Sequence, residues 1–125
     1  MSALSLIAKA ELIAKAERIA RGLRATTAGE RSARHSLYVV LLHDPRTPER
    51  WGLYVGQTAR DPDWRFDQHK SGYKASAAVR RFGVQLLPSV VEHLNLLREW
   101  ESLDLEAAIA DAFRASGIDW VEGGH

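Results

Sequence analysis

The chain has no cysteine among its 125 residues. Disulfide bonds and thiolate metal sites are therefore excluded, and a reducing compartment is compatible with the composition. No apolar run approaches the roughly 18 residues needed to span a membrane. The first residues also lack the basic lead and the apolar stretch of a secretory signal. These absences predict a cytoplasmic protein with no membrane partner.

The net charge of only +1 conceals an uneven distribution of charged residues. Residues 1–35 carry seven basic and three acidic side chains, and residues 58–82 carry six and three. Residues 92–125 instead carry two basic and eight acidic side chains. Because phosphates bind basic surfaces, a nucleic-acid partner would contact the first and middle segments. The alternative is that these charges form ordinary solvated helix faces.

The first segment predicts one long helix over residues 3–24, rich in Ala, Leu, Lys, Glu and Arg. The hexapeptide at residues 6–11 is repeated without change at 12–17. This six-residue period matches neither 3.5 nor 3.6, so a coiled coil is not expected. Residues 25–35 are typical of a linker. We therefore divide the chain into a basic helix and linker, residues 1–35, and a second unit, residues 36–125. The helix is a candidate for self-association, for contact with a partner protein, or for non-specific binding to nucleic acid.

Residues 36–125 predict an α+β domain with a small three-stranded antiparallel sheet flanked by helices. An apolar run at 37–42, a turn at 43–50 and a second run at 52–57 indicate a hairpin. Asp61 and Pro62 predict the start of a helix, because the carboxylate accepts free N–H groups and proline has no N–H that needs an acceptor. Lys70-Ser71-Gly72 predicts the end of this helix. The remaining predicted elements are a helix at 76–82, a strand at 84–93 that Pro88 confines to the sheet edge, a helix at 98–115 and a short strand at 118–121.

Two tyrosines, an arginine and a histidine follow one another in this pattern. Tyr38 and Tyr54 lie in the two strands of the predicted hairpin, and Arg65 and His69 are one turn apart on the helix that begins at Pro62. Hydrolysis of a phosphodiester needs a deprotonated nucleophile, positive charge near the phosphate oxygens, and help for the leaving oxygen. Phenols, a guanidinium and an imidazole together can meet part of that need.

This order of residues resembles the GIY-YIG nuclease family. Ser36-Leu37-Tyr38 stands for the first family triplet and Tyr54-Val55-Gly56 for the second; Arg65, His69 and Glu106 then match the family's helix arginine, histidine and metal-binding glutamate. The resemblance covers residues 36–122. The first triplet lacks Gly and Ile, and the turn between the two tyrosines is longer than is common in the family.

The resemblance implies a GIY-YIG-like fold and a divalent-metal-dependent endonuclease that acts on DNA, with RNA as the other substrate. Tyr38 would activate water, and Tyr54 would position that water or share its proton. Arg65 would stabilise charge on the phosphate. His69 would move a proton or bind phosphate. Glu106 would bind Mg²⁺ or Mn²⁺, for which a carboxylate oxygen is a suitable ligand. The basic residues expected to bind nucleic acid are Lys70, Lys74, Arg80 and Arg81.

Each candidate also has a purely structural explanation. Tyr38 and Tyr54 could be ordinary strand aromatics, Arg65 could pair with Asp61 on its own helix, and His69 could be a solvated helix residue. Five acidic residues lie between Glu99 and Asp111, so Glu101 and Glu99 are alternatives to Glu106. The four tryptophans are expected to pack in the core or at its edge, with base stacking as the alternative: Trp51, Trp64, Trp100 and Trp120. His35, His43, His93 and His125 are too scattered to form a metal site.

A second function class is therefore kept open. The same fold could serve as a catalytically inactive module that binds nucleic acid or another protein.

Overall fold

The computed structural model describes residues 1–124 and is built around a four-stranded mixed sheet. Its strand order is β3-β1-β2-β4, where β1 is Ser36–His43, β2 is Trp51–Thr58, β3 is Gly83–Leu86 and β4 is Val121–Gly123. The central strands β1 and β2 form the predicted antiparallel hairpin. Strand β3 pairs antiparallel with β1, and β4 pairs parallel with β2.

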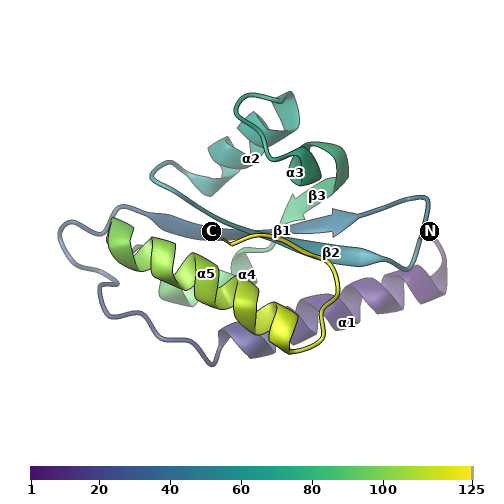
Figure 1. The fold of residues 1–125 in the computed structure, drawn as a ribbon, viewed down its shortest axis with the longest axis horizontal. Helices are drawn as coiled ribbons and strands as arrows, with labels where there is room; N and C mark the ends of the chain where they lie inside the picture. Colours follow the sequence, from purple (N-terminus) through teal and green to yellow (C-terminus); the bar gives the residue numbers. More distant parts are fainter. Residues whose placement is uncertain (125) are drawn as a thin grey trace.

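Helices cover both faces of this sheet (Figure 1). On one face lie α2 (Pro62–Ser71) and α3 (Ala77–Phe82). On the other lie α1 (Ala3–Ala20), α4 (Pro88–Val91) with the 3₁₀ turn η1 (Glu92–Leu94), and α5 (Glu99–Ala115). Both faces of the central hairpin are therefore buried, which explains why β1 is an almost continuous apolar run instead of an alternating one.

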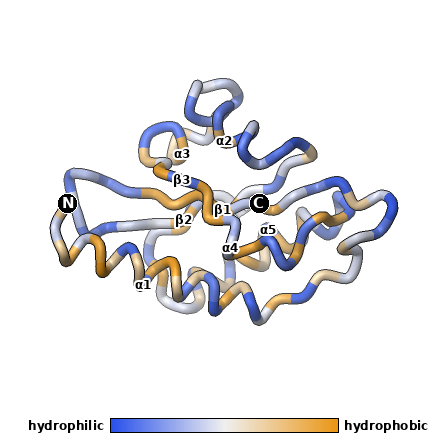
Figure 2. The backbone as a smooth tube through the Cα atoms, turned by 180° about the vertical axis from the view of Figure 1, so that it is seen from behind, coloured by the Kyte–Doolittle hydropathy of each residue, from blue (hydrophilic) through white to orange (hydrophobic). Residues whose placement is uncertain are grey.

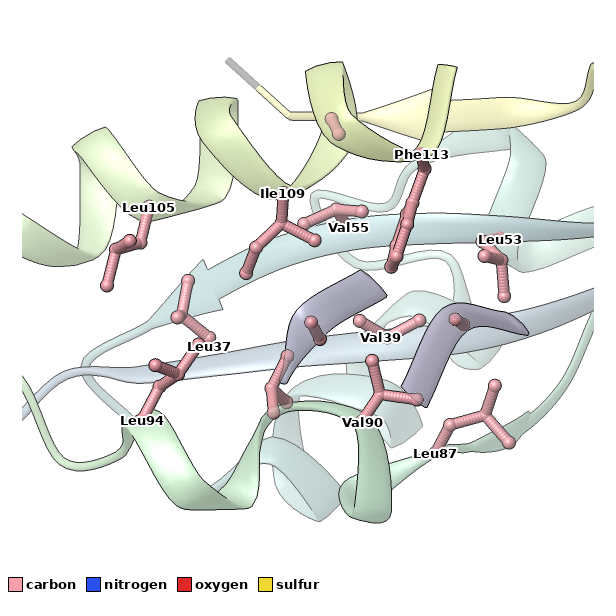
Figure 3. Packing of buried hydrophobic residues seen from close by; sticks show 14 of the residues in the cluster. Leu37, Val39, Leu53, Val55, Leu87, Val90, Leu94, Leu105, Ile109 and Phe113 are labelled. Carbon is pink, nitrogen blue, oxygen red and sulfur yellow. The ribbon is translucent and has the colours of Figure 1, made fainter. Parts of the chain in front are cut away.

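The larger core lies between the sheet and helices α1, α4 and α5. Figure 3 shows Leu105, Ile109 and Phe113 of α5 pointing from the helix toward Val55 and the other strand residues. The smaller core, under α2 and α3, contains Tyr38, Val40, Leu42, Val79 and Trp120. Hydrophobic residues follow the central strands, whereas α2 is predominantly hydrophilic (Figure 2).

The α+β class and the start and end of α2 agree with the sequence prediction. The side chain of Asp61 accepts a hydrogen bond of 2.8 Å from the Asp63 amide, with Pro62 at the first helical position. Gly72 ends the helix with φ of +93°, a left-handed conformation that glycine adopts without strain.

Four predicted elements need correction. The third strand ends at Leu86 and not at 93, because Pro88 begins helix α4 instead of lying within an edge strand. The sheet has a fourth strand, parallel to its neighbour, so it is mixed and not a three-stranded antiparallel sheet. This strand covers Val121–Gly123 in place of the predicted 118–121. The first helix ends at Ala20, earlier than predicted. The edge position of β3 is confirmed.

Helix α1 packs on the rest of the molecule. Its Ala16 and Ala20 are fully buried and belong to the larger core, whereas Leu4, Leu6 and Ile7 near its start are exposed. The predicted linker, residues 25–35, therefore does not separate two hydrophobic cores. The division of the chain into two units at residue 35 stays a prediction. Among residues 1–124, no helix combines the length and the apolar character that crossing a membrane requires.

The tryptophans divide evenly between core and surface. Trp51 and Trp120 are buried, as predicted, but the side chains of Trp64 and Trp100 are exposed. The expectation that all four pack in the core or at its edge is therefore wrong for the two exposed residues.

Candidate active site

Tyr38 and Gly56 face each other across the central hairpin. A Cβ atom added at Gly56 would lie 2.5 Å from the Tyr38 ring, so the ring occupies the space that any side chain at position 56 would need. This contact explains the glycine of Tyr54-Val55-Gly56. It also buries Tyr38, which is only 3% exposed.

His69 on α2 holds the hydroxyl group of Tyr38. Its Nε2 lies 2.8 Å from the Tyr38 oxygen, and its Nδ1 accepts a 2.9 Å hydrogen bond from the Ser76 amide. Because Nδ1 is an acceptor, the neutral ring carries its proton on Nε2 and donates it to the Tyr38 oxygen. The hydroxyl proton of Tyr38 is then free to point elsewhere.

His69 is neutral near pH 7. Burial lowers its pKa to about 4, and the positive charge of Arg65 acts in the same direction. The residue is 1% exposed and both ring nitrogens have partners, which leaves no nitrogen for a phosphate. His69 is therefore a buried partner of Tyr38. The alternative that His69 is an ordinary solvated residue of the helix is wrong.

Tyr38 and Tyr54 lie side by side on the α2 face of the sheet, with ring centroids 6.1 Å apart. Burial raises the pKa of Tyr38 far above its usual value, and the neighbouring Tyr54 raises it further. Burial also raises the pKa of Tyr54, which is less enclosed. Arg65 acts in the opposite direction on both phenols.

Arg65 is fixed by the loop that follows α2. Its guanidinium donates to the carbonyl oxygen of Lys74 at 2.8 Å and to that of Tyr73 at 3.5 Å. Among residues 1–124 no ion pair joins Arg65 to a carboxylate, and Asp61 instead caps the helix. The proposed structural pairing of Arg65 with Asp61 is therefore wrong.

Glu106 on α5 has a buried carboxylate oxygen with no hydrogen-bond partner. The negative charge of Glu106 contributes to raising the pKa of both Tyr38 and Tyr54. Glu106 is 7% exposed, and burial raises its own pKa from 4.5 to about 7, against a smaller lowering by the backbone amide of Gln57. A buried carboxylate that lacks partners is costly unless a ligand compensates it.

The two alternative acids have different surroundings. Glu101 accepts four hydrogen bonds, from the backbone amides and hydroxyl groups of Thr27 and Thr26. Burial alone would raise the pKa of Glu101, but these bonds outweigh it and lower the pKa to about 2. Glu99 is largely exposed and lies 3.5 Å from His35. Glu101 therefore anchors the segment before β1, and Glu106 is the acid whose surroundings leave an oxygen unused.

A single divalent cation fits Glu106. The unused oxygen is a hard donor, and Mg²⁺ commonly takes one or two carboxylates and completes its shell with water and substrate phosphate. Within residues 1–124, no group of three or more His, Asp or Glu side chains is placed to share a metal. Glu106 would thus be the single protein ligand.

The four predicted nucleic-acid-binding residues differ in availability. The ammonium of Lys70 donates to the carbonyl oxygens of Val79, Arg80 and Gly83, which uses its three donors to hold the end of α3. Lys70 is therefore committed to the fold. Lys74, Arg80 and Arg81 are exposed, and Lys74 has a positive φ of 44°.

Several polar residues beside the site were not singled out from the sequence. The side-chain oxygen of Gln57 lies 3.0 Å from Nδ1 of His35 and 3.2 Å from the hydroxyl of Ser102. Ser76 fixes the tautomer of His69 through its amide. A polar residue near the end of an apolar strand was the only local signal for Gln57, and nothing local indicated Ser76.

Comparison of this chain with protein-family models, with curated proteins and with solved structures gave no match. The resemblance to the GIY-YIG family accordingly stays a prediction that rests on the residues themselves.

Proposed function

We propose that this protein is a divalent-metal-dependent endonuclease of GIY-YIG type that hydrolyses phosphodiester bonds in DNA, with RNA as the alternative substrate. The observation that carries the proposal is Glu106. One oxygen of its buried carboxylate has no hydrogen-bond partner, burial raises its pKa to about 7, and its charge acts on the pKa of Tyr38 and of Tyr54. A purely structural role of Glu106 gives no reason for a buried carboxylate oxygen without a partner, whereas a metal-binding role does.

Glu106 would hold Mg²⁺ or Mn²⁺. When bound, such an ion supplies positive charge that offsets the charge of the phosphate. Because a carboxylate must be ionised to bind a metal, a pKa near 7 makes metal binding depend on pH in the neutral range.

The phenols and the guanidinium supply the rest of the proposed chemistry. Tyr38, in its ionised form, takes a proton from the attacking water, and Tyr54 positions that water. His69 stabilises the ionised Tyr38, because its Nε2–H already points at the phenol oxygen. Arg65 lowers the cost of ionising Tyr38 and places a fixed cation near the phosphate.

The experiment is a cleavage assay on plasmid DNA and on structured RNA, with MgCl₂, with MnCl₂ and with EDTA. We expect cleavage that requires the metal and that Glu106→Gln abolishes. The matched control is Asp104→Asn, which changes an exposed acid on the same helix and should retain activity. Metal-independent cleavage, or equal activity of Glu106→Gln and wild type, would contradict the proposal.

The inactive binding module is the second candidate, and the burial of Tyr38 favours it. Burial makes ionisation of this phenol unfavourable, which opposes a role as a base. This candidate predicts binding of nucleic acid without cleavage under any metal condition. The same assay, run beside a binding measurement, separates the two functions.

A further inference from the structure

We propose that a pocket at the start of α5 binds one unpaired nucleotide of a nucleic-acid strand, with its base on Trp100 and its phosphate between Arg34 and Arg98. The pocket measures about 540 Å³, and these three residues line it together with His35, Glu99 and Leu103. The identification of the ligand as nucleic acid rests on the proposed function.

The two arginines lie opposite each other. His35 and Leu97 form an isolated antiparallel bridge, joined by backbone hydrogen bonds of 2.9 and 2.8 Å. The residues next to such a pair, Arg34 and Arg98, then face one another across the bridge. Like charges placed directly opposite are destabilising, and an anion between them relieves the repulsion.

Few protein groups neutralise this pair. Arg98 lies 3.8 Å from Glu30, and both side chains are about half exposed, so the attraction is weak. Within residues 1–124, Arg34 has no carboxylate within ion-pair distance, and Glu99 is directed to His35 instead. The two arginines and one glutamate that line the pocket leave one positive charge in excess for an anion.

Trp100 supplies a flat apolar surface beside these cations. Its side chain is 53% exposed, and the neighbouring Leu103 is also exposed. A nucleobase stacks on such a ring without regard to sequence, and bases that are already unpaired do so without the cost of opening a duplex. An aromatic surface next to two arginines fits a nucleotide better than it fits an inorganic anion or an apolar peptide.

Helix α5 carries both Glu106 and part of the pocket lining. Leu103 is three residues before Glu106, so the two side chains lie on the same side of α5. His35, at the pocket, also contacts Gln57, whose backbone amide acts on the pKa of Glu106. A strand whose scissile phosphate lies at Glu106 could therefore place a neighbouring nucleotide in the pocket.

The test measures binding of a fluorescently labelled short oligothymidylate to the full chain in EDTA, by anisotropy. Trp100→Ala should weaken binding about 5- to 100-fold, the effect of losing one stacked base, and Trp100→Phe should restore part of it. Arg34→Ala should reduce the slope of log affinity against log salt by about 1. The control is Leu4→Ala, which removes an exposed apolar side chain from the start of α1, outside the pocket and the candidate active site.

Equal affinities of the wild type and Trp100→Ala, or equal losses in Trp100→Ala and Leu4→Ala, would overturn the inference. An unchanged salt slope in Arg34→Ala would overturn the phosphate contact. If the melting temperature of Trp100→Ala falls, the affinity of Trp100→Phe and the salt slope of Arg34→Ala test the inference in its place. Metal-dependent cleavage that is indifferent to Trp100 would leave the nuclease proposal intact and remove this one. Trp100-dependent binding without cleavage would support the nucleotide pocket and contradict the nuclease proposal.

Discussion

The ring of Tyr38 lies over Gly56, so that a Cβ atom at position 56 would come within 2.5 Å of the ring. Gly56 of one strand therefore leaves the space that the ring of Tyr38 on the other strand fills. The fixed ring presents its oxygen to His69, whose other nitrogen is held by the Ser76 amide. The position of the proposed base thus depends on a residue that has no side chain.

Gly56→Ala should destabilise the fold by about 1 to 3 kcal/mol, the usual cost of forcing extra volume into a packed site. Combining it with Tyr38→Ala should cost less than the sum of the two single changes, because the clash disappears with the ring. Urea denaturation of the four proteins in this cycle measures the coupling. Additive effects would contradict the contact.

Arg65→Ala should lower the cleavage rate about 10²- to 10³-fold, the size expected for losing one preorganised donor near a developing charge. Arg65→Lys should recover only part of the rate, because lysine lacks the planar fork that holds the carbonyl oxygens of Tyr73 and Lys74. Single-turnover rates at saturating substrate give the measurement. A loss below about threefold for both variants would place Arg65 outside the site, since removing one such donor costs far more.

Glu106→Gln should stabilise the metal-free protein at pH 8. Because burial raises the pKa of Glu106 from 4.5 to about 7, its contribution to stability is fully present below pH 4.5 and is lost as the pH rises through 7. The neutral amide avoids this loss, a gain of about 1 to 3 kcal/mol at pH 8 that should vanish near pH 4.5. Thermal unfolding at several pH values tests it.

The same unfolding experiment also tests the metal. Mg²⁺ should raise the melting temperature of the wild type at pH 8 but not that of Glu106→Gln. Asp104→Asn, which changes an exposed acid on the same helix, serves as the control and should respond like the wild type. An equal shift in all three proteins would mean that the ion binds elsewhere.

Ala16→Leu in helix α1 should destabilise the protein by about 1 to 3 kcal/mol, because Ala16 is fully buried in the larger core. Replacing the exposed Arg18 and Arg21 with Gln should leave stability unchanged. If the helix also binds nucleic acid, the Gln variant should flatten the salt dependence of binding. An unchanged salt slope would restrict α1 to packing.

Local signals were sufficient for the central hairpin and for helix α2. Apolar strand residues, the turn between them, the Asp61 cap and Gly72 all act over a few positions, so the sequence predicts them directly. Pro88 shows the limit of such signals, because the same residue suits either a strand edge or the first position of a helix. The structure uses it for the helix.

The sequence by itself determined that the chain forms an α+β fold, with two tyrosines on a hairpin and an arginine and a histidine on the following helix. Only the tertiary structure distinguished the acidic residues of α5. Glu101 is satisfied by Thr27, which lies 74 positions earlier, whereas Glu106 keeps an unpartnered buried oxygen. Burial and long-range hydrogen bonds set the pKa of a carboxylate, and neither can be read from neighbouring residues. The hydrogen bonds of Lys70 to the end of α3, and the placement of Arg34 opposite Arg98, likewise depend on contacts between segments that are separated in the sequence.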